Sequence, residues 1–219
     1  MKQKPAIQDL LRVMARLRSP TGCPWDREQN HRTLRRHAIE EVYELIDAIE
    51  AGDDHEMAEE LGDLLMQVVF HCQLAKERGA FDFEKVCRLL AEKLVRRHPH
   101  VFGKTKVKNV GEVWANWEKI KKAEKHGTKH ARHSAFDGIP KHLPALLRAE
   151  KLVKKVRKVL AEGDHAGGHF SKRKLTKSAL AKELFELAAS AQARGWSAEE
   201  LLSAETKQRE RRFRRREKA

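Results

Sequence analysis

The sequence predicts an all-α protein, and two observations carry that prediction. Apolar residues recur at i, i+3, i+4 and i+7, the spacing of one helix face, through residues 6–17, 33–50, 55–78 and 82–97. Alternating runs rich in Val, Ile and Thr, which would indicate strands, are nearly absent. We therefore expect the first half of the chain to form helices at these four segments.

The breaks between these helices contain Gly, Pro or a helix-capping Asp. They are "SPTGCPW" (19–25), "AGDD" (51–54), "RGAFD" (78–82) and "RHPHVFG" (97–103). The "AGDD" break is short, which favours an antiparallel arrangement of helices 33–50 and 55–78. The middles of these two helices are then expected to lie side by side.

The second half predicts a smaller helical unit. A short helix is expected around 111–125, and "LPALLRAEKLVKKVRKVLAEG" and "KSALAKELFELAASAQARG" are amphipathic patterns separated by the polar stretch "GDHAGGHFSKRK". We expect a first domain at 1–125, a linker at 126–138 and a helical region with a basic tail at 139–219. Residues 74–97 and 190–212 also share an order of features: a helix end, Arg-Gly, an aromatic residue, an acidic helix start and an Arg pair.

Composition bounds the class of protein. The chain has 219 residues, 40% of them hydrophobic, and three scattered cysteines, too few for a disulfide framework. It contains no run of about 18 apolar residues and no apolar leader, so a cytoplasmic protein without a membrane span is expected. Its formal charge of +14 is uneven, because residues 1–103 hold 16 Lys and Arg against 18 Asp and Glu, whereas residues 104–219 hold 30 against 14.

Carboxylates gather on two helices that are otherwise apolar. Glu40, Glu41 and Glu44 lie on one side of helix 33–50, and Glu60 and Asp63 repeat the i, i+3 spacing in helix 55–78. Converging carboxylates repel one another and are costly to bury unless a positive charge compensates them. No Lys or Arg occurs between residues 37 and 75, so a divalent cation is the simplest candidate.

An all-oxygen ligand set suits Mg²⁺, with Mn²⁺ as the alternative. Two other interpretations stay open on the residues alone. The Glu pairs could be solvated surface groups, since charged residues make up 36% of the chain. A di-iron site would need paired Glu-x-x-His motifs, and the one match, Glu28 to His31, precedes the long helices.

Basic and aromatic residues suitable for a nucleotide follow in the sequence. Lys93, Arg96 and Arg97 close helix 82–97 and are candidate ligands of phosphate, although charges there also compensate the helix dipole. Three of the four tryptophans are candidates for stacking on a base, or plugs between helices: Trp25, Trp114 and Trp117.

Four stretches together resemble the MazG family of nucleoside triphosphate pyrophosphohydrolases. They are "GCPWDREQNHRTLRRHAIEEVYELIDAIEAGD", "EELGDLLMQVVFHCQLAKERGAFDFEKV", "KLVRRHPHVFG" and "VWANWEKIKKAEK", and the resemblance covers residues 6 to about 125. It implies an all-α dimer that hydrolyses an NTP or dNTP to the monophosphate and pyrophosphate with Mg²⁺. It also implies Glu41, Glu44, Glu60 and Asp63 as metal ligands, Glu40 as an accessory catalytic carboxylate, and Lys93, Arg96 and Arg97 along the triphosphate.

The second half departs from the family pattern. It resembles a shortened second MazG domain in which Glu183 and Glu186 stand where ExxD is expected, and the preceding EExxE helix is replaced by "GDHAGGHFSKRK". This region is therefore expected to be non-catalytic. The alternative function is a non-catalytic regulatory protein that binds a nucleotide or nucleic acid through "RERRFRRREKA". A solvated basic tail is the commoner outcome, so a nucleoside triphosphate and a second copy are the expected partners and nucleic acid is not.

Overall fold

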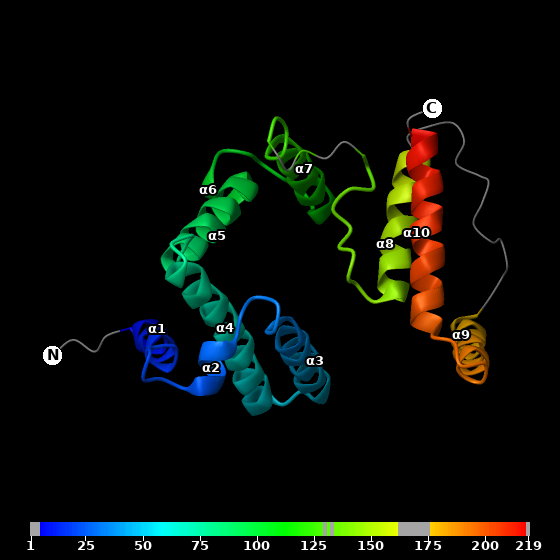
Figure 1. The fold of residues 1–219 in the computed structure, drawn as a ribbon. Helices are drawn as coiled ribbons and strands as arrows, with labels where there is room; N and C mark the ends of the chain where they lie inside the picture. Colours follow the sequence, from blue (N-terminus) through cyan, green and yellow to red (C-terminus); the bar gives the residue numbers. More distant parts are fainter. Residues whose placement is uncertain (1–4, 129–130, 132–133, 162–175, 218–219) are drawn as a thin grey trace. The chain divides into compact units, whose positions relative to one another are not determined.

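The computed structural model describes residues 5–128, 131, 134–161 and 176–217, and within these ranges the chain forms ten helices and no strand (Figure 1). The all-α prediction is confirmed. No helix in these ranges combines the length and the apolar character needed to span a bilayer. The helices are α1 (Ala6–Leu17), α2 (Pro24–Glu28), α3 (Arg35–Ala51), α4 (Asp54–Glu77), α5 (Phe83–Arg97), α6 (Pro99–Phe102), α7 (Val110–Ala123), α8 (Ala145–Ala161), α9 (Lys177–Gln192) and α10 (Ala198–Glu217).

The chain divides into two compact units, unit 1 (Met1–Trp117) and unit 2 (Glu118–Ala219), with the boundary inside α7. Unit 1 contains 19 Lys and Arg and 19 Asp and Glu, whereas unit 2 contains 27 and 13. The whole positive excess of the chain therefore belongs to unit 2.

The core of unit 1 lies where α1 and the segment before α3 pack against the second half of α4. Its buried members are Met14, Leu34, Val69, Phe70 and Leu74. At the edge of this core, both Arg18 Nε and Arg18 Nη2 donate 2.7 Å hydrogen bonds to the two carboxylate oxygens of Glu77. This forked ion pair ties the end of α1 to the end of α4.

The first half of α4 packs instead against α3, and the two helices form an antiparallel hairpin, as the short "AGDD" break predicts. Gly52 ends α3 in the left-handed conformation (φ 69°), which glycine adopts without steric cost. The Asp53 carboxylate then caps α4 by accepting from the backbone N–H groups of His55 (2.9 Å) and Glu56 (3.2 Å).

Two short helices lie where the sequence predicts breaks. α2 falls partly within the 19–25 break, and α6 falls within the 97–103 break. Each begins with proline at its first position, Pro24 and Pro99. Proline ends a preceding helix but fits the first turn of a new one, so the same residue that indicates a break also starts these helices.

The repeat seen in the sequence is present in the backbone. Gly79 (φ 67°) ends α4 and Gly195 (φ 69°) ends α9. The Ala80 N–H donates to Ala75 O, and the Trp196 N–H donates to Ala191 O, both at 2.9 Å. Such a bond closes a glycine turn at a helix end, so α4–α5 and α9–α10 are joined in the same way.

Unit 2 is built on α8 and α10, which pack side by side around Phe136, Leu152 and Val156. α9 contacts α10 but is otherwise weakly covered by the described residues. The polar stretch predicted between the two amphipathic patterns (163–174) lies outside the described residues, which resume at Thr176.

Candidate functional site

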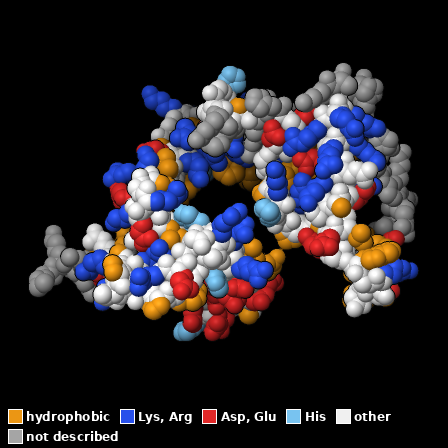
Figure 2. Space-filling model, in the orientation of Figure 1, with side chains coloured by type: hydrophobic (Ala, Val, Ile, Leu, Met, Phe, Trp, Pro, Cys, Tyr) orange, Lys and Arg blue, Asp and Glu red, His pale blue; other side chains and the backbone are white. Residues whose placement is uncertain are grey.

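Three carboxylates meet between α3 and α4. Glu41 of α3 and Glu60 and Asp63 of α4 are each half-buried, and one carboxylate oxygen of each lies within 4.8 Å of the others. Figure 2 shows acidic side chains gathered over the α3–α4 hairpin. The antiparallel packing brings together residues 19 to 22 positions apart in the chain, and no Lys or Arg is present in either helix between residues 37 and 75 to neutralise them.

Gln67 orients one member of this group. Its side chain is 5% exposed, and its Nε2 donates a 3.1 Å hydrogen bond to Glu41 Oε1. Gln67 lies one turn after Asp63 and two turns after Glu60, so it is on the same face of α4. The amide therefore holds the Glu41 carboxylate toward the two carboxylates of α4.

Burial and neighbouring carboxylates raise the pKa of two members of the group. Burial raises the pKa of Glu41, the Gln67 hydrogen bond partly opposes that rise, and the charges of Asp63 and Glu44 add to it. Burial also raises the pKa of Glu60, with further contributions from Glu44, Asp63 and Glu41. In addition, Glu60 Oε2 is buried without a hydrogen-bond partner. A bound cation would remove both costs at once.

The other two predicted carboxylates lie at the margin of this group. Glu44 is exposed and outside the three-residue group, yet its charge acts on both Glu41 and Glu60. Glu40 is exposed and lies 3.3 Å from His37 Nδ1 in its own helix. His37 in turn meets Trp25 edge-on, with ring centroids 5.8 Å apart. Glu40 and Trp25 are thus neighbours of one histidine beside the carboxylate group.

One predicted phosphate ligand, Arg97, meets the other two tryptophans at a different place. Arg97 lies over the ring of Trp117 at 5.7 Å, and Trp117 and Trp114 meet edge-on at 5.4 Å. Lys93 and Arg96 lie on the same last turns of α5 as Arg97. The structure therefore brings one arginine and two aromatic rings together where α5 and α7 meet.

Within one chain, this cationic and aromatic surface is separate from the carboxylates. Asp63 lies 14 residues before the end of α4, about 21 Å along the helix axis. α5 starts at that far end and leads away from α3 (Figure 1). The sequence does not predict this separation, because it gives the order of the helices but not the direction in which α5 leaves α4.

Three residues of the site are not among those predicted from the sequence. Gln67 could have been predicted from its position on the same helix face as Glu60 and Asp63, whereas no sequence pattern marks His37. His98 joins the cationic surface, with its ring 6.3 Å from Trp117 and 5.6 Å from His100. Its place depends on the turn between α5 and α6, which sequence spacing does not fix.

Comparisons with known proteins show which part of the chain is similar to a known family. Residues 29–102, which contain the carboxylates and the α5 cations, match the family model described as the MazG nucleotide pyrophosphohydrolase domain. A nucleoside triphosphate pyrophosphohydrolase of Escherichia coli strain K12 is 49% identical over 154 residues, covering 70% of this chain and 58% of that protein. A nucleoside triphosphate pyrophosphohydrolase/pyrophosphatase MazG of Thermotoga maritima is 49% identical over 146 residues, covering 67% and 54%.

The chain thus spans little more than half the length of these two relatives. Another relative matches more of its length. An uncharacterized 26.1 kDa protein in the blaB 3' region of Streptomyces cacaoi is 39% identical over 200 residues, which are 90% of this chain and 77% of that protein. The similarity therefore extends well into unit 2.

Proposed function

Because the chain belongs to the MazG family, we propose that it hydrolyses nucleoside triphosphates (NTP or dNTP) to the monophosphate and pyrophosphate in a Mg²⁺-dependent reaction. The observation that carries the proposal is the group of Glu41, Glu60 and Asp63 between α3 and α4, which lies within the matched domain. Pyrophosphate release is expected because the relatives in Escherichia coli and Thermotoga maritima are named for that activity.

The residues present fit a divalent metal ion. The unpaired Glu60 Oε2, the raised pKa values of Glu41 and Glu60 and the all-oxygen donor set favour Mg²⁺, with Mn²⁺ as an alternative. Glu41, Glu44, Glu60 and Asp63 would hold the metal, Glu44 by a side-chain rotation from its exposed position. Bound there, the metal supplies positive charge for phosphate oxygens and lowers the pKa of a water molecule.

The chain's own groups supply orientation and charge. Gln67 fixes the Glu41 carboxylate, and Glu40 is the candidate acceptor of a proton from water, held at the site's margin by His37. Lys93, Arg96 and Arg97 would lie along the triphosphate, where Arg can fork onto two phosphate oxygens. Trp114 and Trp117, and Trp25 on the carboxylate side, would stack on the base.

We also propose that the protein acts as a homodimer through one face of the α3–α4 hairpin. This face carries a stripe of exposed apolar side chains on each helix. They are Ile39, Val42, Ile46 and Ile49 on α3 and Leu61, Leu65 and Val68 on α4. Each stripe is shifted by one residue from the positions at which α3 and α4 face each other: Val42 comes directly after Glu41, and Leu61 directly after Glu60. One residue is a rotation of about 100°, and because the helices are antiparallel it turns both stripes to the same side.

The sequence predicts that these apolar helices are buried, and one chain does not bury this face. Ile46 is 44% exposed and Leu65 is 39% exposed, so the cover has to come from elsewhere. A second copy would provide it, and it would also be a source of the α5 cations that one chain holds apart from its carboxylates. The cytoplasm is the expected compartment, since Cys23, Cys72 and Cys87 are free thiols.

The test is an assay of the purified chain with a panel of NTPs and dNTPs in the presence of Mg²⁺, resolving pyrophosphate from single phosphate. We expect monophosphate and pyrophosphate in equal amounts, and loss of both on addition of a chelator. A protein that binds these nucleotides but releases neither product, with Mg²⁺ and Mn²⁺ both supplied, would favour the non-catalytic alternative. A diphosphate with single phosphate would mean that a different bond is cut.

A further inference from the structure

Unit 2 contains a strongly basic helix pair whose geometry the sequence does not reveal. α8 and α10 run in the same direction, because Ala145, the first residue of α8, donates its N–H to Glu199 of α10 at 2.5 Å, whereas Lys155 and Arg214 meet around Asp137 near the other end. The segments "KLVKKVRK" (151–158) and "KQRERRFRRR" (207–216) therefore lie side by side. They are far apart in the chain, so composition alone shows two basic runs rather than one surface.

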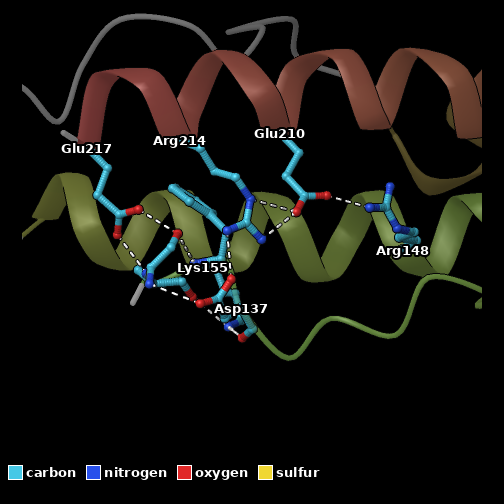
Figure 3. A network of polar contacts seen from close by, with 9 residues as sticks. Asp137, Arg148, Lys155, Glu210, Arg214 and Glu217 are labelled. Carbon is cyan, nitrogen blue, oxygen red and sulfur yellow. Dashed lines mark hydrogen bonds and ion pairs between the residues drawn. The ribbon is translucent and has the colours of Figure 1, made fainter. Parts of the chain in front are cut away.

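The acidic side chains at this end are turned inward (Figure 3). Glu210 accepts from Arg148 and, at 2.8 Å, from Arg214 Nη2, while Arg214 Nη1 donates to Asp137 at 2.7 Å. Glu217 accepts from the Ala135 N–H at 2.6 Å. These contacts use the three carboxylates to join α8, α10 and the segment before α8.

Four exposed cations form a stripe on one face of the pair: Lys151 of α8 and Lys207, Arg211 and Arg215 of α10. Lys151 precedes the buried Leu152 by one residue, and Arg211 follows the inward-facing Glu210 by one. In helices that run in the same direction, opposite rotations of about 100° turn side chains to the same side. Figure 2 shows Lys and Arg side chains gathered over this helix pair.

Helix-dipole compensation does not account for the stripe. A helix end carries only about half a negative charge, and its effect is confined to the last turn. α10 ends at Glu217 and α8 at Ala161, so Lys207, Arg211 and Lys151 all lie more than one turn before their helix ends. Holding four like charges together in one stripe favours a polyanion as ligand, and the exposed Glu200, two turns before Lys207, marks where the stripe ends.

We propose that this stripe of Lys151, Lys207, Arg211 and Arg215 binds the phosphate backbone of a nucleic-acid duplex. Residues 207, 211 and 215 are spaced by four, which is about 6 Å along the helix and close to twice the axial spacing of phosphates on one strand. The aromatic residue of the segment, Phe213, packs on Phe136 at 6.1 Å, so no ring of the stripe reads a base. Binding is therefore independent of base sequence.

An anionic membrane fits the stripe less well. A helix that binds a lipid surface places apolar side chains between its cations so that they enter the bilayer. Between Lys207 and Arg215 the α10 part of the stripe contains no apolar member, while the exposed Leu147 lies one turn before Lys151 on α8. The stripe can therefore form several phosphate contacts at an aqueous surface but offers a bilayer little apolar area to bury.

The test is fluorescence anisotropy of the full chain with a labelled 20-base-pair DNA duplex between 25 and 150 mM salt. We expect the logarithm of the association constant to fall with the logarithm of salt concentration, with a slope of about −3 to −4 for four contacts. The double variant Arg211→Gln/Arg215→Gln should weaken binding about tenfold and reduce the slope by about two.

The matched control is Arg212→Gln/Arg216→Gln, which removes the same charges at the same spacing from a different face of α10. It should weaken binding less than about threefold, with helical content of both variants equal to that of the unmodified chain. Equal losses in the two variants would overturn the assigned surface. Polyglutamate or vesicles with anionic lipid that compete as well as unlabelled duplex at equal charge would overturn nucleic acid as the ligand.

Discussion

α4 and α9 end in the same glycine turn and lead into helices of similar character, yet they carry different parts of the molecule. α4 pairs with α3 along its first half, and that pairing gathers Glu41, Glu60 and Asp63. α9 packs chiefly on α10 among the described residues, and its Glu183 and Glu186 belong to no group of three potential metal ligands there. Two helices can therefore share the same turn geometry although only one of them carries the carboxylate group, because that group also needs a partner helix such as α3.

The second difference between the units is where charge is placed. Unit 1 is balanced overall and concentrates carboxylates in a half-buried place, where their pKa values rise. Unit 2 carries the whole excess of cations and turns Asp137 and Glu210 inward, where they pair with arginines (Figure 3). The first arrangement attracts a metal ion, whereas the second attracts a polyanion.

Matched substitutions in α4 and α9 should give the largest contrast. Asp63→Asn should lower turnover of nucleoside triphosphates by at least about a hundredfold, because it removes a charged metal ligand. Glu186→Gln, at an exposed position of α9, should leave turnover within about twofold. The metal-free melting temperature of Asp63→Asn should hold or rise, since the substitution relieves repulsion of Glu41 and Glu60. Equal loss in both variants would make unit 2 part of the active site.

The next largest effect should be on dimerisation, when charges are placed in the exposed apolar face of each unit. Ile46→Arg/Leu65→Arg places two charges in the proposed dimer face of unit 1 and should shift the protein from dimer to monomer at micromolar concentration in light scattering. Leu184→Arg/Leu187→Arg makes the same change on α9 and should leave the dimer intact. A dimer that resists the first pair and is lost with the second would transfer the interface to unit 2.

The helix class and the helix order follow directly from the sequence, because apolar periodicity is a local property. The carboxylate group could also be predicted, since a short break forces α3 and α4 into a hairpin and the i, i+3 spacing fixes one face of each. The meeting of Arg97 with Trp117 could not be predicted in the same way. It depends on how α5, α6 and α7 turn at Pro99 and Gly103, and a proline indicates a break without giving its angle.

The inward network of unit 2 is hidden for a related reason. Asp137 and Arg214 are 77 residues apart, and nothing in the spacing of either segment marks the other as its partner. The sequence shows that the second half is basic. It does not show that Glu210 and Asp137 are turned inward to pair with Arg148 and Arg214.

Substituting the glycine of either turn by alanine should lower the unfolding free energy by the same moderate amount. Gly79→Ala and Gly195→Ala each force a Cβ into the left-handed conformation, at a cost of about 1 to 2 kcal/mol in the unfolding free energy. No atom lies within 4 Å of the added Cβ at either position, so the cost is conformational alone. Gly62→Ala, inside α4 and equally open, should instead stabilise by about 0.5 to 1 kcal/mol. Chemical denaturation measures all three, and unequal costs at 79 and 195 would break the equivalence of the turns.

The smallest expected effect is a pH dependence that unit 1 has and its counterpart in unit 2 lacks. The hydrogen bonds from Arg18 hold the pKa of Glu77 below its ordinary value of 4.5. The position that matches Glu77 before the second glycine turn is Ala193, which has no carboxylate to titrate. Of these two helix ends, only that of α4 should therefore lose stability in acid through titration of the residue at this position.

The sign follows from proton binding. Unfolded Glu77 takes up a proton at a higher pH than folded Glu77, so its contribution to stability is complete above about pH 4.5 and is lost as the pH falls through the folded pKa. Glu41 and Glu60 act in the opposite direction, because their raised pKa values favour protonation of the folded state. The melting temperature of the unmodified chain alone therefore mixes both effects.

The difference between the unmodified chain and Glu77→Gln isolates the effect of Glu77: it should be largest at pH 6 to 7 and shrink as the pH falls below 4.5 through the folded pKa. A difference that stays constant from pH 7 to pH 3 would mean that the Arg18 and Glu77 pair contributes packing rather than charge.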